Sequence, residues 1–152
     1  MGDFNAGPGL TDETGLVGTE PNLAEPQKRM LSSMTPTILE RPDGSLFALL
    51  GTVGGRTIIN SVLQVTLNMI ELDMGVLEAV SARRIHHQWL PDEIRAESGA
   101  IAEDVAADLE RRGHALARGG EWGGVHTLQI GEDGTRLGAP DPRRTDAAAV
   151  GH

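Results

Sequence analysis

The sequence contains no cysteine and no tyrosine, and its aromatic residues are two phenylalanines and two tryptophans. Without cysteine the chain has no disulfide, no thiolate nucleophile and no cysteine-based metal site, and redox chemistry does not indicate its compartment. With so few aromatic rings, a core must be filled by packed aliphatic side chains, which favours a layered fold.

Basic residues and long apolar runs are also scarce. The 13 lysines and arginines are outnumbered by 22 aspartates and glutamates, giving a formal charge of −9. This balance argues against nucleic acid and anionic membrane surfaces as partners. No run reaches the roughly 18 apolar residues of a membrane span, and the N-terminus lacks the layout of a signal peptide. The 152 residues suit one domain with a substantial core.

Two short apolar runs, 37–41 and 45–50, flank the turn sequence Pro42-Asp43-Gly44. Proline presets φ for such a turn and glycine accepts a positive φ, so the pattern predicts an antiparallel hairpin. A hairpin brings the residues before its first strand and after its second strand to the same edge of a sheet.

Candidate site residues lie on both flanks of this hairpin. Ser32 and Ser33 precede it, and Gly54 and Gly55 follow it and lead into a helix expected over 57–72. Glycines let backbone N–H groups approach a ligand, and the first N–H groups of a helix are unpaired, so the glycine pair suits an anion or oxyanion. The structural alternatives are strand-edge capping for the serines and an ordinary turn for the glycines.

The helix expected over 57–72 carries two adjacent apolar stripes, which predict a helix covered on more than one side. Gly75 is expected to end it. Further helices are predicted over 76–82 and 102–112, a strand over 92–97, and a second hairpin over 124–130 and 135–139. Because hairpins outnumber regular strand-helix alternations, the fold class is α+β. The stripes hold Ile58, Val62, Val65, Met69 and Leu72, and beside them Ile59, Leu63, Leu67 and Ile70.

Two other stretches attract functional hypotheses. His86 and His87 are neighbours, but adjacent side chains diverge and no cluster of carboxylates surrounds them. We interpret them as hydrogen-bonded structural histidines rather than metal ligands, and Trp89 as a packing anchor rather than a cofactor platform. The segment 5–28 is long, irregular and rich in glycine and proline, which predicts a lid or a loose terminus.

Several motifs, in this order and spacing, resemble the C-terminal part of the small subunit of γ-glutamyltranspeptidases, and the resemblance covers essentially all of the chain. It implies the fold of N-terminal nucleophile hydrolases, a four-layer αββα sandwich of antiparallel sheets flanked by helices. The chain would form one partial domain over residues 1–152. The motifs are Met1-Gly2-Asp3-Phe4, Leu31-Ser32-Ser33-Met34-Thr35-Pro36-Thr37, Gly54-Gly55, Arg84-Ile85-His86-His87-Gln88-Trp89-Leu90-Pro91 and Asp141-Pro142-Arg143.

The resemblance also implies roles for site residues. Asp3 would bind the α-amino group of a γ-glutamyl donor such as glutathione, and Ser32 and Ser33 its α-carboxylate. The backbone N–H groups of Gly54 and Gly55 would bind the oxyanion. These roles agree with the chemistry of the residues, since a carboxylate suits an ammonium and paired hydroxyls suit a carboxylate. No metal and no cofactor is implied.

The family's threonine nucleophile lies upstream of the region that is resembled, so this chain contains no nucleophile. Alone, we expect it to be inactive as a transferase or hydrolase. Its expected partners are the γ-glutamyl substrate and the upstream part with the large subunit, and exposed faces of an incomplete sandwich favour homo-oligomers. The family is periplasmic or secreted, whereas a chain expressed in this form would be cytoplasmic. Met1 falls inside the family's Met-Asp-Asp-Phe stretch, which suggests a truncated gene, a mis-called start or a fragment.

Two alternatives remain open: a β-lactam acylase of the same superfamily that cleaves a glutaryl amide, and a non-catalytic remnant or binding module. The sequence also departs from the family's pattern at several positions. Thr14 replaces a gating tyrosine, Thr52-Val53 replaces Ser-Pro, Arg56-Thr57 replaces Ser-Arg, and His126 replaces a glutamine.

Overall fold

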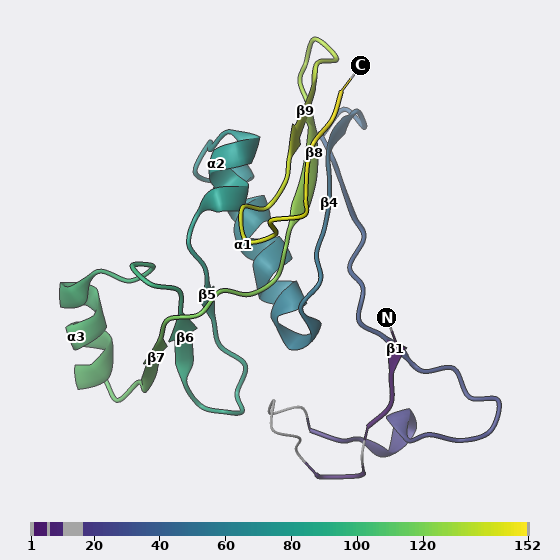
Figure 1. The fold of residues 1–152 in the computed structure, drawn as a ribbon, viewed down its shortest axis with the longest axis vertical. Coiled ribbons are helices and arrows are strands. Elements are labelled where there is room, and N and C mark those ends of the chain that lie inside the picture. The colour runs from purple at the N-terminus through teal and green to yellow at the C-terminus, as the bar shows by residue number, and fades with distance from the viewer. Residues whose placement is uncertain (1, 6, 11–16, 152) are drawn as a thin grey trace.

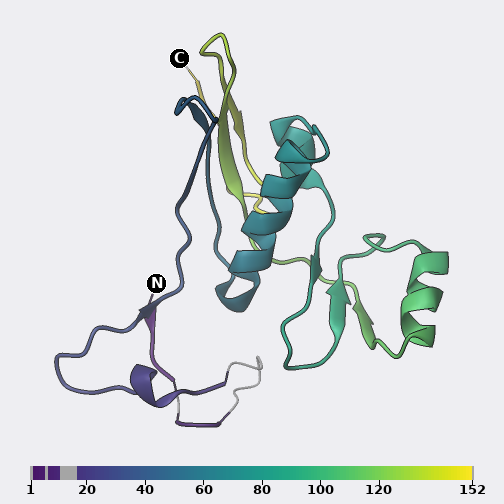
Figure 2. The ribbon, with the colours of Figure 1, turned by 180° about the vertical axis from the view of Figure 1, so that it is seen from behind.

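The structure is a computed structural model that describes residues 2–5, 7–10 and 17–151. Its main body is a four-stranded antiparallel sheet in the order β3-β4-β8-β9, with two helices on one face (Figures 1 and 2). This arrangement confirms the α+β class and corresponds to one sheet and one helix layer of the expected sandwich. The strands are β3 (Thr37–Glu40), β4 (Leu46–Gly51), β8 (His126–Ile130) and β9 (Arg136–Ala139), and the helices are α1 (Ile58–Ile70) and α2 (Val76–Ser81).

Both predicted hairpins are confirmed. In the first, Thr37 pairs with Leu50, and the turn is closed by a hydrogen bond from the Arg41 N–H to the Ser45 carbonyl at 2.8 Å. Ala48 and Leu50 alternate toward the helices and are buried there, as the period of two in a strand requires. Because of this hairpin, β4 ends at the edge of the sheet near which α1 begins (Figure 1).

Helix α1 buries only one of its two apolar stripes. Val62, Val65 and Met69 pack on the sheet and on α2, whereas Ile59 in the second stripe is 70% exposed and Leu63, Leu67 and Ile70 are exposed as well. The expectation of cover on more than one side is therefore wrong for this chain by itself. Gly75 does not end the helix either: Asp73 adopts the positive φ, and Gly75 is the N-cap of α2.

A second sheet lies to one side of the main body (Figure 1). Its strands are β5 (Ile85–His86), β6 (Ile94–Ala96) and β7 (Leu116–Arg118), and helix α3 (Glu103–Arg111) connects the last two. Strands β6 and β7 are parallel, a pairing that was not predicted because the three residues of β7 carry no clear alternation. The other predicted strand and helix of this region are present.

The N-terminal part forms a third unit, beyond the lower end of the main sheet in Figure 1. Strand β1 (Gly2–Asp3) pairs with β2 (Leu31–Ser32), and a short helical turn, η1 (Glu20–Asn22), lies between them. In the described part of this segment, the side chain of Asn22 donates to Asn5 and accepts from the Leu31 N–H. The role of 5–28 as a lid stays a prediction, and Thr14 lies outside the described residues.

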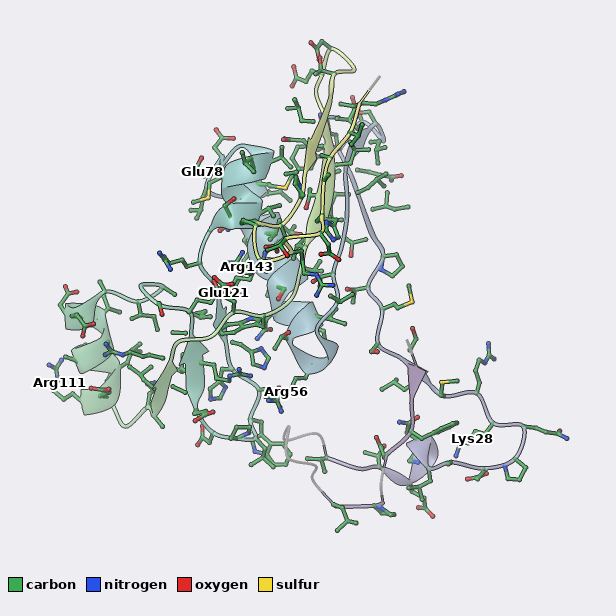
Figure 3. The ribbon with its side chains drawn as sticks, in the orientation of Figure 1. Lys28, Arg56, Glu78, Arg111, Glu121 and Arg143 are labelled. Atoms are coloured by element: carbon green, nitrogen blue, oxygen red, sulfur yellow. The ribbon has the colours of Figure 1, made fainter. Side chains whose placement is uncertain are left out.

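A buried network of two arginines and two carboxylates joins the two larger sheets. Arg84 Nη2 donates to Asp141 Oδ2 at 2.6 Å, and these side chains are 1% and 0% exposed. Arg143 binds Glu97 and Asp141 and also donates to two carbonyls at the end of α2. Figure 3 shows Arg143 below α2, where the segment after β9 crosses the molecule. Of the helices in the described part of the chain, none combines the length and hydropathy that a membrane crossing requires.

We expect Asp141→Asn to lower the free energy of unfolding by about 3 kcal/mol, because it leaves the buried guanidinium of Arg84 without its counter-charge. Denaturation of the chain with urea, followed by tryptophan fluorescence, measures this change. The matched control is Asp146→Asn, whose carboxylate lies exposed 3.8 Å from Arg144 and should change stability by under about 0.5 kcal/mol. Equal effects of the two substitutions would show that the buried network does not stabilise the fold.

Candidate functional site

The turn between β4 and α1 presents two backbone N–H groups at the start of a helix. Gly54 has a φ of 137° and Gly55 a φ of 55°, and both precede α1 through the short turn η2 (Gly55–Thr57). Among the described residues, the N–H groups of Gly54 and Gly55 have no hydrogen-bond acceptor. The Gly54 carbonyl is instead occupied, since it accepts from the N–H and the hydroxyl of Thr57 at 3.2 and 3.0 Å. Two unpaired donors at a helix start can bind a negative oxygen.

Only glycine fits at position 54. A Cβ atom there would lie 2.6 Å from Thr57 Oγ1 and 3.3 Å from the Cα atom of Gly123. The φ of Gly54 is also one that other residues rarely adopt. Glycine at position 54 is therefore favoured by its φ and by the closeness of Thr57 and Gly123, whereas the approach of a ligand to its N–H stays a prediction.

The N-terminal candidates come together at the level of the backbone. In the register of β1 and β2, Asp3 lies opposite Leu31 and Gly2 opposite Ser32, so positions 3 and 32 are on neighbouring strands. Ser32 is exposed and Ser33 is half-buried. Pairing over such a long stretch of sequence could not be predicted from two-residue strands.

A pocket of about 330 Å³ lies close in sequence to both groups of candidates. It lies between Met34-Thr35-Pro36, which follow the serines, and Gly51-Thr52-Val53, which precede Gly54. Neither Ser32 nor Gly54 lines it. The structure thus places the strand pair and the glycine turn toward the same end of the main sheet (Figure 1). The pocket is lined by the neighbours of both groups in sequence.

The departures from the family's pattern at positions 52, 56 and 126 fall at this end of the molecule. His126 is exposed, pairs with Gly51 across β4 and β8, and lines the same pocket. Arg56 lies at the start of α1 and extends toward the connection between β5 and β6 (Figure 3). Thr52 donates its hydroxyl proton to the Val53 carbonyl and accepts from the Gly124 N–H. This last contact was not predicted, because 72 residues separate its partners.

The two neighbouring histidines have structural partners. His86 is buried, and its ring nitrogens lie 3.0 Å from Asn60 Nδ2 and 2.7 Å from Gln88 Oε1. Burial lowers the pKa of His86, and the nearby positive charges of Arg56 and Arg95 lower it further, although the Gln88 hydrogen bond opposes this shift. His87 Nε2 lies 3.2 Å from Asp92. In the described part of the chain, no three His, Asp or Glu side chains group in a way that could hold a metal ion.

Comparisons with known proteins show which family shares this sequence. The family model of gamma-glutamyltranspeptidase matches residues 1–151. The chain is 43% identical over 152 residues to the glutathione hydrolase proenzyme of Escherichia coli K12, covering all of this chain and 26% of that protein. It is 41% identical over 147 residues to the proenzyme of Pseudomonas aeruginosa, covering 94% of this chain and 26% of that protein. The chain therefore spans about a quarter of the length of these curated relatives.

Solved structures agree. A mutant of the gamma-glutamyltranspeptidase from Helicobacter pylori superposes with a TM-score of 0.86 at 40% identity, over 93% of this chain and 77% of that chain. The enzyme from Pseudomonas nitroreducens, complexed with L-DON, gives 0.87 at 36% identity, over 98% and 78%. The fold is that of the N-terminal nucleophile hydrolases. The chain belongs to the gamma-glutamyltranspeptidase family.

We expect the free energy of unfolding to fall as the pH drops below 6.5, the ordinary pKa of histidine. The reason is that His86 takes up a proton in the unfolded chain, whereas the folded ring, with its lowered pKa, does not. The contribution of His86 to stability is fully present above pH 6.5, and it is lost progressively as the pH falls to the pKa of the folded ring. Urea midpoints between pH 7.5 and 5 measure it. His86→Gln should flatten the profile over this range, whereas His114→Gln, at an exposed ring, should retain it; identical profiles for the two variants contradict the assignment.

Proposed function

We propose that this chain supplies the donor-binding and oxyanion-binding part of a γ-glutamyltransferase or hydrolase. The observation that carries the proposal is the turn at Gly54 and Gly55, whose two unpaired N–H groups stand at the start of α1 in a member of this family. Attack of a threonine hydroxyl on the γ-carbonyl forms a tetrahedral oxyanion, and two such donors stabilise it. The resulting γ-glutamyl ester is then resolved by an amino acid, a peptide or water.

In the proposed site, donor recognition falls to the strand pair. The carboxylate of Asp3 would bind the α-ammonium of the glutamyl group, and the hydroxyls of Ser32 and Ser33 its α-carboxylate. The register of β1 and β2 supports this division, because it sets positions 3 and 32 on neighbouring strands. The pocket beside Met34, Thr35 and Pro36 is also lined by Thr52 and Val53, which precede the glycine turn.

The nucleophile comes, in this proposal, from the upstream region of the same enzyme. The chain spans about a quarter of its curated relatives, and it presents two apolar surfaces that need a partner. One is the exposed stripe of α1. The other is the outer face of the sheet, where Ile38 pairs with Leu49 and Leu49 with Leu128, and where Ile38 is 66% exposed. Exposed apolar patches of this kind mark interaction sites, and we assign both to that upstream region.

A second candidate function is cleavage of a glutaryl amide. The cephalosporin acylase of Bacillus halodurans shares the fold with a TM-score of 0.72 at 26% identity, over 86% of this chain and 25% of that chain. A glutaryl group and a glutamyl group both end in a carboxylate, but only the glutamyl group adds an ammonium. Asp3 therefore discriminates between the two functions.

The 152-residue chain alone is expected to release no amine from a γ-glutamyl anilide, and the complete enzyme is expected to release it. Gly54→Ala in the complete enzyme should lower kcat about 100-fold, because the new methyl group meets Thr57 Oγ1 and displaces the turn. Gly75→Ala is the matched control, since its φ is −61° and no atom lies within 4 Å of the added Cβ; it should keep wild-type kcat. Turnover by the purified chain alone would refute the claim that the chain contains no nucleophile. An unchanged kcat in Gly54→Ala would refute the oxyanion role of the turn.

Asp3→Asn tests donor recognition. It should raise KM for the γ-glutamyl anilide at least tenfold, because the ammonium loses a charged partner, and it should leave turnover of the matched glutaryl anilide within about twofold. Both substrates are assayed on the same enzyme preparation, so folding differences cancel. Equal changes with the two substrates would contradict the assignment of Asp3 to binding of the α-ammonium group.

A further inference from the structure

We propose that Thr52 is a positioning residue, whose hydroxyl fixes the glycine turn against the loop 122–125. This inference rests on the oxyanion role proposed above and adds a residue to it. Thr52 follows the last residue of β4 and precedes Gly54 by two positions, so it stands on the strand side of the turn, while Thr57 binds the Gly54 carbonyl from the helix side.

The glycine turn lies directly on this loop. A Cβ built on Gly54 would be 3.3 Å from the Cα atom and 3.5 Å from the backbone nitrogen of Gly123. Gly123 has a φ of 77°, and a Cβ there would be 3.3 Å from Thr52 Oγ1 and 3.1 Å from Ser61 Oγ. The two glycine backbones are thus packed so closely that little room is left between them for a side chain.

The Thr52 hydroxyl makes one hydrogen bond to each side of this contact. It accepts from the Gly124 N–H at 3.0 Å and donates to the Val53 carbonyl at 2.8 Å. The second bond orients the peptide that joins Val53 to Gly54, and the N–H of that peptide is one of the two proposed oxyanion donors. A single hydroxyl therefore sets the direction of a catalytic donor relative to the loop.

The loop itself is anchored in the buried charge network. Arg84 Nη1 donates to the Trp122 carbonyl at 3.1 Å, and the Val125 N–H donates to Asp141 Oδ2 at 2.7 Å. Arg84 and Asp141 also bind each other. The residues on both sides of Gly123 and Gly124 are consequently held by Arg84 and Asp141. The hydrogen bond from Gly124 to Thr52 then holds the glycine turn against this loop.

The test compares Thr52→Val, which keeps the shape and removes the hydroxyl, with Thr52→Ser, which keeps the hydroxyl. In the complete enzyme, Thr52→Val should lower kcat for a γ-glutamyl anilide about tenfold and leave KM within about twofold, since the strands that bind the donor are not changed. Thr52→Ser should stay within about twofold of wild type in both. The matched control is Thr127→Val on β8, where the buried hydroxyl has no partner among the described residues; its kcat should not change.

Amide hydrogen exchange gives a readout that does not depend on activity. Thr52→Val should speed exchange of the Gly124 N–H at least tenfold and leave exchange of the Leu49 N–H on β4 unchanged. In Thr52→Ser, both N–H groups should exchange at wild-type rates. If Thr52→Val leaves kcat and Gly124 exchange at wild-type values, or if Thr52→Ser loses as much as Thr52→Val, the proposal is overturned. If the wild-type enzyme does not turn over γ-glutamyl substrates, the proposed function fails, and exchange at Gly124 alone then decides whether Thr52 positions the turn.

Discussion

The buried ion pair between Arg84 and Asp141 holds together the parts of this chain that are distant in sequence. Arg84 opens the second sheet, and Asp141 follows the last strand of the first sheet. An arginine and an aspartate that are 1% and 0% exposed are costly to bury, and hydrogen bonds to their other polar atoms offset part of that cost, although Arg84 Nε has no partner among the described residues. Here Val80 in α2 and Trp122 and Val125 in the loop 122–125 supply carbonyl or N–H partners from two further segments.

From this pair the arrangement extends to the glycine turn. The loop 122–125 is fixed by Arg84 and Asp141, Gly54 rests on Gly123, and α1 begins one turn later. The charge network is far from the exposed surface, yet it determines where two unpaired backbone donors stand. The Asp141 carboxyl fits this account: burial alone would raise its pKa, but hydrogen bonds from the Arg143 N–H, Arg84 and the Val125 N–H together hold the pKa below its ordinary value. The carboxylate therefore stays charged over the physiological range.

Much of the fold could be predicted because its signals are local. The hairpin around Pro42-Asp43-Gly44 and the helix α1 follow from turn residues and periodicity within fifteen or so residues. The two stripes of α1 were recognised, but sequence alone does not say that the stripe with Ile59 is left exposed in this chain. The parallel pairing of β6 with β7 was missed, because three-residue strands carry little pattern and their pairing depends on the whole connection through α3.

The candidate site was predictable in a different way. The chemistry of Ser32, Ser33, Gly54 and Gly55 allowed ordinary structural roles, and only the resemblance to a family selected catalytic ones. Thr52 and Gly123 could not be found from the sequence, since their importance lies in contacts across about seventy residues of chain. The glycine at 54 nevertheless meets a physical requirement, because a Cβ there would lie 2.6 Å from Thr57 Oγ1 and its φ is rare for other residues.

The central claim is that the turn at Gly54 and Gly55 and the strand pair around Asp3 and Ser32 form one site for a γ-glutamyl group. A crystal structure of the complete enzyme with bound glutamate tests it most directly. The account predicts a γ-carboxylate oxygen about 2.7–3.1 Å from the N–H groups of Gly54 and Gly55, with the ammonium at Asp3 and the α-carboxylate at Ser32 and Ser33. Glutamate bound elsewhere, or a turn whose two N–H groups are paired within the protein, would contradict it.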